Sequence, residues 1–289
     1  MMKIAVIGSA GQLGSDIVSQ LKLSHNVVGL THADISIEDF NTASEKLKEI
    51  SPDCIINTAA YHNVELCEIN PQQAFLINAT AVKNLCSIAN ELNCSLVHFS
   101  TNYVFGGETQ TLPFTEIDRT SPVNMYGISK LAGEYMIRSY CNKWYIFRVA
   151  GLYGKTGTKA KKYKNFIDMM VNLAKDKKEL PSSNDEIFTF TSTSDLAKMI
   201  NFILPKNSYG LYHATNSGEC SRFTFTQEIF RLLNIDCKLN GVSRNYFPTK
   251  YTQPSYTVLD NSKLTNIGFK MPHWKDSLKE YIESMYGKN

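Results

Sequence analysis

The sequence has no long hydrophobic run. Nowhere in its 289 residues do about 18 apolar residues follow one another, the length that a membrane-spanning helix needs. The sequence also lacks an excess of charge of one sign, because 30 Lys and Arg are nearly balanced by 27 Asp and Glu, for a net charge of +3. No nucleic-acid partner is therefore indicated. The first residues, MMKIAVIGSAGQLG, are not typical of a signal peptide, so we expect a cytoplasmic protein with no membrane partner.

The seven cysteines are odd in number, and no CxxC motif occurs. Zinc sites and disulfide frameworks use paired, closely spaced cysteines, so we expect reduced thiols in the core and no metal site. Tryptophan is also rare, and we expect its two copies, Trp144 and Trp274, to be structural.

Strand-like and helix-like segments alternate through the first half of the chain. Short apolar segments at 3–7, 27–30, 54–57, 95–100 and 145–149 are predicted strands, and 12–23, 37–50, 72–92 and 124–140 are predicted helices. In the helix over 37–50, Phe40, Ala43, Leu47 and Ile50 share the apolar face. The alternation predicts an α/β fold, a Rossmann-type doubly wound parallel sheet.

After Arg148 this rhythm breaks. Helices are predicted over 166–175, 194–204 and 275–285, with a strand near 188–190. We therefore predict a dinucleotide-binding domain over 1–150 and a smaller C-terminal substrate-binding lobe over most of 151–289. Elements around 185–213 are expected to return to the first domain.

A glycine motif directly follows the first predicted strand and opens the first predicted helix. Gly8 permits a tight turn, Gly11 lets backbone N–H groups approach a pyrophosphate, and Gly14 lets the helix pack close to the sheet. The N-terminus of the helix favours an anion. The motif in this context predicts dinucleotide binding, against the alternative of a simple turn.

The residues that would recognise the cofactor ribose are less distinct. The acid that favours NAD is absent after the second strand, where Thr31 and His32 stand. This leaves room for NADPH, with NADH still open. Asp34 and Ile35 would contact the adenine, or Asp34 would belong to the N-cap region of a helix that begins near Ser36.

Two further motifs carry polar groups suited to proton transfer. Tyr126 and Lys130 are four residues apart, so they share one face of a helix, and a nearby ammonium lowers the pKa of a phenol. Ser100 and Thr101 end the fourth strand, where a hydroxyl can reach a ligand in the crevice at the carboxyl edge of the sheet. We predict Thr101, Tyr126 and Lys130 as the catalytic residues.

Together these motifs resemble the dTDP-4-dehydrorhamnose reductase family, a branch of the extended short-chain dehydrogenases, which use the spacing GxxGxxG. The resemblance runs nearly end to end and includes GSAGQLG (8–14), NTAAYHNVELCE (57–68), INATAV (77–82), STNYVF (100–105), PVNMYGISKLAGE (122–134), IFRVAGLYG (146–154), DLA (195–197), GLYHATNSGE (210–219) and QPSYTVLDNSKL (253–264). It implies an NADPH-dependent reduction of a 4-keto group on a nucleotide-linked deoxysugar, with a homodimer as an open alternative.

The resemblance also implies residue roles. Gln12 and Leu13 would contact the pyrophosphate, and Lys130 would also hold the nicotinamide ribose. The other cofactor-binding positions would be Asp34, Ile35, Ala59, Ala60, Tyr61, Asn78, Ser100 and Tyr126. Substrate contacts would come from Val64, Asn102, Tyr103 and Gly151.

Four positions depart from the family pattern on the sugar-nucleotide side. Asn102 replaces the usual Asp, Gln253 an Arg, Thr257 a Ser, and Gly151-Leu152 stands where a Trp is common. An epimerase or 4,6-dehydratase of the same superfamily is an alternative, but a dehydratase needs an acid where Asn102 stands. A non-catalytic dinucleotide-binding subunit is another. Asp16 lies near a magnesium contact of some relatives, but one carboxylate is not a site.

Two remaining sets of residues are open to either of two interpretations. Lys159, Lys161, Lys162 and Lys164 would neutralise a substrate diphosphate or form a solvated loop. Tyr153, Tyr163, Phe166 and Tyr256 would stack on a thymine or pack in a core.

Overall fold

A parallel sheet of six strands forms the centre of the computed structural model, which describes residues 1–108, 110–156 and 165–287. Its spatial order is β10-β5-β4-β3-β1-β2, and every neighbouring pair is parallel. The strands are β1 (Lys3–Ile7), β2 (Asn26–Leu30), β3 (Cys54–Asn57), β4 (Ser95–Thr101), β5 (Trp144–Val149) and β10 (Gly210–His213). The predicted Rossmann-type α/β fold is confirmed.

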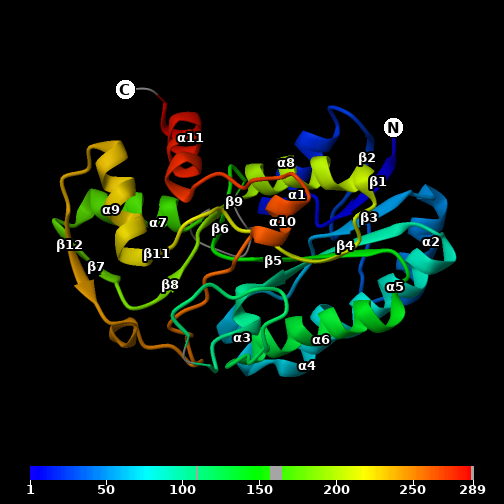
Figure 1. Ribbon diagram of the computed structural model, residues 1–289, viewed down its shortest axis with the longest axis horizontal. Coiled ribbons are helices and arrows are strands. Elements are labelled where there is room, and N and C mark those ends of the chain that lie inside the picture. The colour runs from blue at the N-terminus through cyan, green and yellow to red at the C-terminus, as the bar shows by residue number, and fades with distance from the viewer. Residues whose placement is uncertain (109, 157–164, 288–289) are drawn as a thin grey trace.

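Helices cover both faces of this sheet, as Figure 1 shows. On one face α1 (Gln12–Leu21) packs against α8 (Thr193–Ile203), and on the other lie α2 (Phe40–Ile50), α5 (Ala81–Glu91) and α6 (Met125–Tyr140). Ile4 and Val6 of β1 pack with α1 and α8 in the first core, whereas Ala5 and Ile7 pack on the opposite face of the sheet with α2 and α5. Successive side chains of a strand point to opposite faces, so a strand covered on both sides is apolar throughout.

The helix predicted over 37–50 begins later than expected. α2 starts at Phe40 because the carboxylate of Asp39 accepts hydrogen bonds from the backbone N–H groups of Asn41 and Thr42. Asp34 is therefore not in the N-cap region of this helix. Phe40 is 41% exposed and was wrongly placed on the apolar face, which Ala43, Leu47 and Ile50 do form.

The long helix predicted over 72–92 is interrupted by a π-helical turn. The observed segments are α4 (Pro71–Phe75), the π turn Leu76–Thr80 and α5. α3 (Val64–Ile69) precedes them. The π turn brings the backbone oxygen of Asn78 against Gly133 of α6, where an added Cβ would overlap it. Single turns of this kind are common at functional sites.

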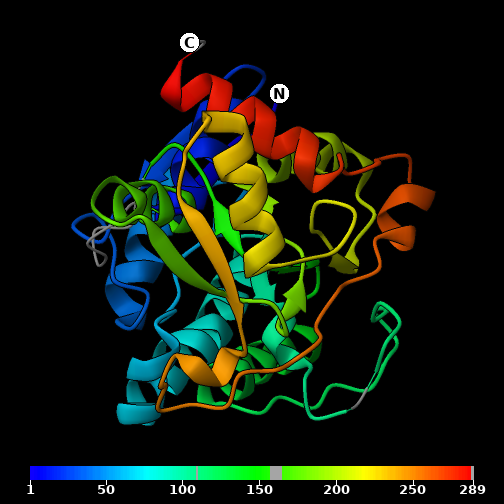
Figure 2. The same cartoon turned by 90° about the vertical axis from the view of Figure 1, so that its left-hand side faces the viewer.

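A second core lies beside the sheet, and in Figure 2 the helices and strands that form it face the viewer. It is formed by α7 (Phe166–Asp176), α9 (Arg222–Leu233) and α11 (Trp274–Tyr286) with the parallel pair β7 (Glu179–Ser183) and β12 (Lys238–Val242). Two short pairs complete it: β8 (Ile187–Phe188) with β11 (Cys220–Ser221), and β6 (Leu152–Tyr153) with β9 (Thr191–Ser192). The strand predicted near 188–190 is thus β8, outside the main sheet.

The chain returns to the first core near its end. Leu264 of α10 (Ser262–Asn266) and Met271 pack with residues of α1 and α8. Trp274 is buried in the second core. All seven cysteines are buried and unbridged. Among the described residues, no helix has the length and apolarity needed to cross a membrane.

Candidate functional site

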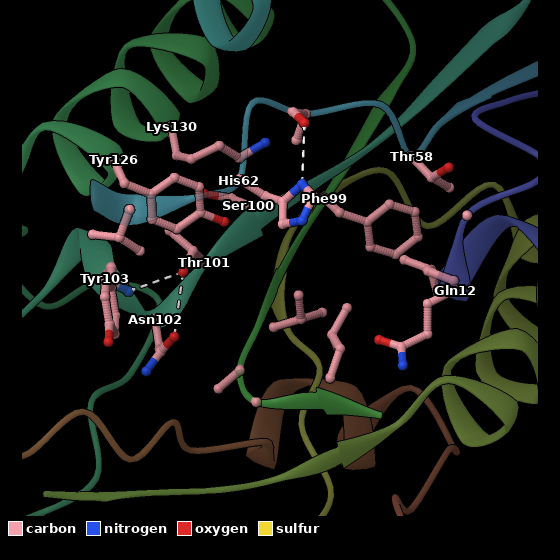
Figure 3. Close-up of a pocket in the computed structure, with 18 of the residues that line it drawn as sticks. Gln12, Thr58, His62, Phe99, Ser100, Thr101, Asn102, Tyr103, Tyr126 and Lys130 are labelled. Carbon is pink, nitrogen blue, oxygen red and sulfur yellow. Dashed lines mark hydrogen bonds between the residues drawn. The ribbon is translucent and has the colours of Figure 1, made fainter. Parts of the chain in front are cut away.

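A cleft of about 350 Å³ opens at the carboxyl ends of the parallel strands (Figure 3). Residues after β1, β3, β4 and β5 form one side, and Glu186, Phe188 and Arg222 of the second core close the other. A second hollow shares Gly11, Thr58, Ala59, Ala60 and His62 with this cleft and continues to Thr31, His32 and Ile35. Together the two hollows run from the end of β2 to the second core, so an extended ligand could lie along them.

The glycine turn has the conformation that the motif predicts. Gly8 has φ +80°, which glycine adopts readily, and a Cβ on Gly14 would overlap the backbone oxygen of Gly8. Gly11 is the N-cap of α1 and provides no side chain to cap it. The amide of Gln12, oriented to satisfy both of its contacts, donates to the Leu152 oxygen (3.2 Å) and accepts from the Gly154 nitrogen (3.1 Å). The start of this helix therefore suits a pyrophosphate.

At the far end of the second hollow, two acidic side chains already accept hydrogen bonds from neighbouring residues. The carboxylate of Asp34 accepts from the backbone nitrogen (2.8 Å) and hydroxyl (2.7 Å) of Thr31, which lowers the pKa of Asp34. Glu38 accepts from Gln73 at 2.6 Å. His32 and Thr31 line the hollow where an acid would repel a 2′-phosphate. Thr31 and His32 leave room there for the 2′-phosphate of NADPH, while Glu38 lines the same hollow and no Lys or Arg of the described residues does.

Tyr126 lines the cleft close to Thr101, which ends β4. A hydrogen bond with Thr101 favours the ionised phenol, but burial outweighs it and raises the pKa of Tyr126 to about 12. The Thr101 hydroxyl donates to Asn102 Oδ1 (3.2 Å) and accepts from the backbone nitrogen of Tyr103 (3.2 Å). Tyr126 therefore keeps its proton at neutral pH.

Lys130 follows one helical turn later on the same face of α6, and Figure 3 shows both side chains extending toward the cleft. It is only 1% exposed, and burial lowers its pKa to about 8. Its Nζ lies 3.1 Å from Nε2 of His98, whose pKa burial keeps well below its usual value. The sequence predicts that an ammonium at Lys130 lowers the pKa of Tyr126; in the structure Lys130 also contacts His98, and burial raises the pKa of Tyr126.

A buried network lies directly behind the cleft. Ser100 donates to Glu134 Oε1, and Arg148 donates to both carboxylate oxygens of Glu134, from Nε (2.9 Å) and Nη2 (2.8 Å). Arg148 Nη1 also lies 3.3 Å from Nε2 of His213. The hydroxyl proton of Ser100 is thus committed to the protein interior.

The substrate positions expected from the resemblance meet the second core across the cleft. Val64, Asn102, Tyr103 and Gly151 all line it, and Asn102 Nδ2 donates to the Thr257 hydroxyl at 2.7 Å. Opposite them, Arg222 pairs with Glu186 (Nε to Oε2, 2.8 Å), and its guanidinium lies over the rings of Phe166 and Phe188. No sequence motif predicted that Arg222 and Glu186 would lie at the cleft.

Most predicted cofactor positions lie on the two hollows, and three do not. The lining positions are Gly8, Gly11, Gln12, Leu13, Gly14, Ile35, Ala59, Ala60, Ser100, Tyr126 and Lys130. Asp34, Tyr61 and Asn78 are absent from that lining. Asn78 is fully buried and instead holds the Tyr61 segment, accepting from its nitrogen (2.9 Å) and donating to its oxygen (3.0 Å), while also donating to Ser129 (3.0 Å).

The remaining candidates have mixed outcomes. Tyr153 is fully buried and packs against Phe225 and Tyr281, so it belongs to the core. Tyr163 and the lysines at 159, 161, 162 and 164 lie outside the described residues. Asp16 accepts a short hydrogen bond from Thr193, and no cluster of His, Cys, Asp and Glu that could hold a metal occurs in the described part of the chain.

Comparison with known proteins agrees with this geometry. The family model described as RmlD substrate binding domain matches residues 2–286. Spore coat polysaccharide biosynthesis protein SpsK of Bacillus subtilis is 32% identical over 284 residues, which cover 98% of each chain.

Two solved structures are also similar. A dTDP-4-dehydrorhamnose reductase from Clostridium acetobutylicum superposes with a TM-score of 0.92 and 37% identity, over 99% of this chain and 100% of that one. The reductase of Bacillus anthracis, in complex with NADP, gives a TM-score of 0.92 and 31% identity over 98% and 99%. The chain belongs to the RmlD substrate binding domain family.

Proposed function

We propose that this protein is an NADPH-dependent reductase of a 4-keto group on a nucleotide-activated deoxysugar. The substrate is dTDP-4-dehydrorhamnose or a close analogue, and the product serves the synthesis of cell-surface polysaccharide. The observation that carries the proposal is the meeting of Thr101, Tyr126 and Lys130 with the glycine turn on one cleft. Membership of a family whose named members include dTDP-4-dehydrorhamnose reductases supports it.

In this mechanism the chain supplies placement and a proton, and bound NADPH supplies the hydride. Tyr126 gives its phenolic proton to the carbonyl oxygen of the substrate, a role that suits a group protonated at neutral pH. Thr101, at hydrogen-bond distance from Asn102 and Tyr103, orients the keto oxygen. Lys130 would hold the nicotinamide ribose.

The rest of the cleft binds the two ligands. Gly11, Gln12 and Leu13 would hold the pyrophosphate of the dinucleotide, and Ala59 and Ala60, which line both hollows, would lie beside it. Val64, Asn102, Tyr103 and Gly151 contact the sugar nucleotide. Asn102 cannot act as the acid of a dehydratase, which favours reduction over elimination of water.

The division into domains and the assembly also stay proposals. Residues 1–150 form the dinucleotide-binding domain, to which α8 and β10 add, and most of 151–289 forms the substrate-binding lobe around the second core. A homodimer and a cytoplasmic location stay predictions of the sequence, and light scattering of the purified protein tests the first.

The decisive experiment follows the absorbance of NADPH in the presence of dTDP-4-keto-6-deoxysugars, with NMR analysis of the product. Wild type should consume NADPH only when the keto sugar is present. Tyr126→Phe should lose roughly 10²- to 10⁴-fold in kcat, because it removes the general acid, and should still bind NADPH. Tyr209→Phe, a change at an exposed tyrosine remote from the cleft lining, is the matched control. Full activity in Tyr126→Phe would remove Tyr126 from this role.

A further inference from the structure

Arg222 and Glu186 form an ion pair at the cleft that has no part in the mechanism above. The short strands β8 and β11 bring the two residues together, because Ser221 is paired with Ile187 in an antiparallel register. One step further along the chain in each direction stand Glu186 and Arg222, the first residue of α9. The backbone pairing therefore fixes the point at which the guanidinium enters the cleft.

Glu186 uses only one edge of this guanidinium. The Nε and Nη2 atoms of Arg222 donate to the two carboxylate oxygens of Glu186, at 2.8 Å and 3.3 Å. Within the described part of the chain Nη1 makes no hydrogen bond. The Glu186 side chain is 5% exposed, whereas that of Arg222 is 34% exposed and lines the cleft. Both protons of Nη1 and one of Nη2 thus remain for a ligand.

Two aromatic rings restrict the guanidinium further. Its central carbon lies 5.4 Å from the ring centre of Phe166 and 5.3 Å from that of Phe188. Contacts between a cation and an aromatic face are attractive, and the planar guanidinium of arginine is well suited to them. Glu186 and the two rings therefore hold Arg222 in place before a ligand arrives, so binding restricts its side chain little further.

The charges around the cleft indicate what this ligand is. Among the described residues, Arg222 and Lys130 are the only Lys or Arg side chains that line the cleft, and Lys130 lies one helical turn from Tyr126. A nucleotide-linked sugar carries a negatively charged diphosphate on C1, across the sugar ring from a keto group at C4. Arginine binds phosphate oxygens through two parallel N–H groups. Arg222 therefore has the charge and the donors that a diphosphate needs.

Tyr103 connects this pair with the residues of proton transfer. Its ring lies edge-on to the ring of Tyr126, with centroids 6.1 Å apart. Burial and Glu186 raise the pKa of Tyr103 and Arg222 opposes them, so both members of the pair lie near its hydroxyl. A sugar whose keto oxygen meets Tyr126 can therefore extend past Tyr103 toward Arg222.

We propose that Arg222 binds the diphosphate of the sugar-nucleotide substrate, in an orientation that Glu186, Phe166 and Phe188 fix. The inference rests on the proposed function, because it takes the substrate to be a nucleotide-linked sugar. The cofactor also carries a pyrophosphate, but the start of α1 offers that group a helix N-terminus on the other side of the cleft. Arg222 therefore acts on the affinity for the substrate and leaves that for NADPH unchanged.

Calorimetric titration of the full chain with dTDP, in the presence of saturating NADP⁺, measures this contact without turnover. NADP⁺ occupies the glycine turn, so dTDP is left with the substrate side of the cleft. Arg222→Gln should weaken dTDP binding roughly tenfold to a hundredfold, as expected for loss of a hydrogen bond to a charged group. Its affinity for NADPH should match that of wild type. Equal dTDP affinity in the two proteins would overturn the proposal, as would a wild type that does not bind dTDP.

Arg231→Gln is the matched control. Arg231 also lies on α9, and it donates from Nε (3.0 Å) and Nη2 (2.7 Å) to the carboxylate of Glu228, but it is absent from the cleft lining. This variant should bind dTDP as wild type does. A loss of dTDP affinity as large as that of Arg222→Gln would show a general effect of breaking an ion pair on α9 and overturn the proposal.

The double variant Arg222→Gln with Glu186→Gln covers the case in which Arg222→Gln does not fold. It removes both charges, so no buried carboxylate is left without its partner. Its dTDP affinity should stay as low as that expected of the single variant. Recovery to the wild-type affinity would show that the ion pair is merely structural and would overturn the proposal.

The assay of NADPH consumption separates this inference from the proposed function. With a keto sugar nucleotide, Arg222→Gln should raise KM by a factor similar to its loss of dTDP affinity and change kcat less. If no keto sugar is reduced but Arg222→Gln still weakens dTDP binding, the reductase proposal fails and the diphosphate contact stands. If both proteins reduce the keto sugar with equal KM and bind dTDP equally, the reductase proposal stands and the contact is refuted.

Discussion

Replacing Glu134 with glutamine should destabilise the protein strongly, although the two side chains have nearly the same shape. Glu134 is 1% exposed, and its carboxylate accepts two hydrogen bonds from Arg148, which is 2% exposed. Glutamine removes the negative charge and presents an NH₂ group to a buried guanidinium. Removing one member of a buried ion pair typically costs about 3–5 kcal/mol, because the remaining charge stays desolvated.

That loss corresponds to a fall in Tm of roughly 6–15 °C, taking about 2–3 °C per kcal/mol for a chain of this size. Thermal unfolding followed by circular dichroism measures it. Glu49→Gln is the matched control, since the exposed pair of Lys46 and Glu49 should leave Tm nearly unchanged. The double variant Glu134→Leu with Arg148→Met should be more stable than Glu134→Leu alone, because no charge is left buried. Equal Tm values for Glu134→Gln and Glu49→Gln would refute the reasoning.

Two further predictions concern stability. Burial and Arg148 lower the pKa of His213 to about 3, so between pH 6.5 and 3 the unfolded chain binds the proton that the folded chain refuses, and stability falls as the pH falls through this window. Between pH 7 and pH 5, wild type should therefore lose about 2 kcal/mol more of its free energy of unfolding than His213→Gln, and its Tm should fall further. Parallel curves of Tm against pH for the two proteins would contradict this. Gly133→Ala should lower the free energy of unfolding despite the better helix propensity of alanine, because its Cβ would overlap the Asn78 oxygen in the π turn. Denaturant titration tests this against Ser139→Ala on the exposed face of the same helix, and a stabilised Gly133→Ala would count against the close approach.

The sequence predicts the sheet well, and it places Thr101 and Tyr126 close together, because both depend on local patterns. β1 is a nearly continuous apolar segment, because a strand that is buried on both faces carries apolar side chains on both. Thr101 and Tyr126 could be placed near each other because one ends a parallel strand and the other begins the helix that follows it. The carboxyl ends of parallel strands meet at one edge of the sheet.

What the sequence could not predict depends on contacts between distant segments. The start of α2 was misplaced because several polar residues near Ser36 could cap a helix, and only the structure selects Asp39. Glu186 and Arg222 reach the cleft from separate segments of the second core, so no sequence motif of fixed spacing predicts them. His98 looked like one more residue of a buried strand, and its contacts with Asn57 and Lys130 follow from the register of β3 and β4 and the packing of α6.

Burial decides the protonation state of Tyr126 in the proposed reaction. A tyrosine that removes a proton, as oxidation of an alcohol requires, must first become a phenolate. With the pKa of Tyr126 near 12, that ionisation at pH 7 costs about 7 kcal/mol. With its phenol protonated, Tyr126 can donate a proton to the oxygen of a keto group that is being reduced.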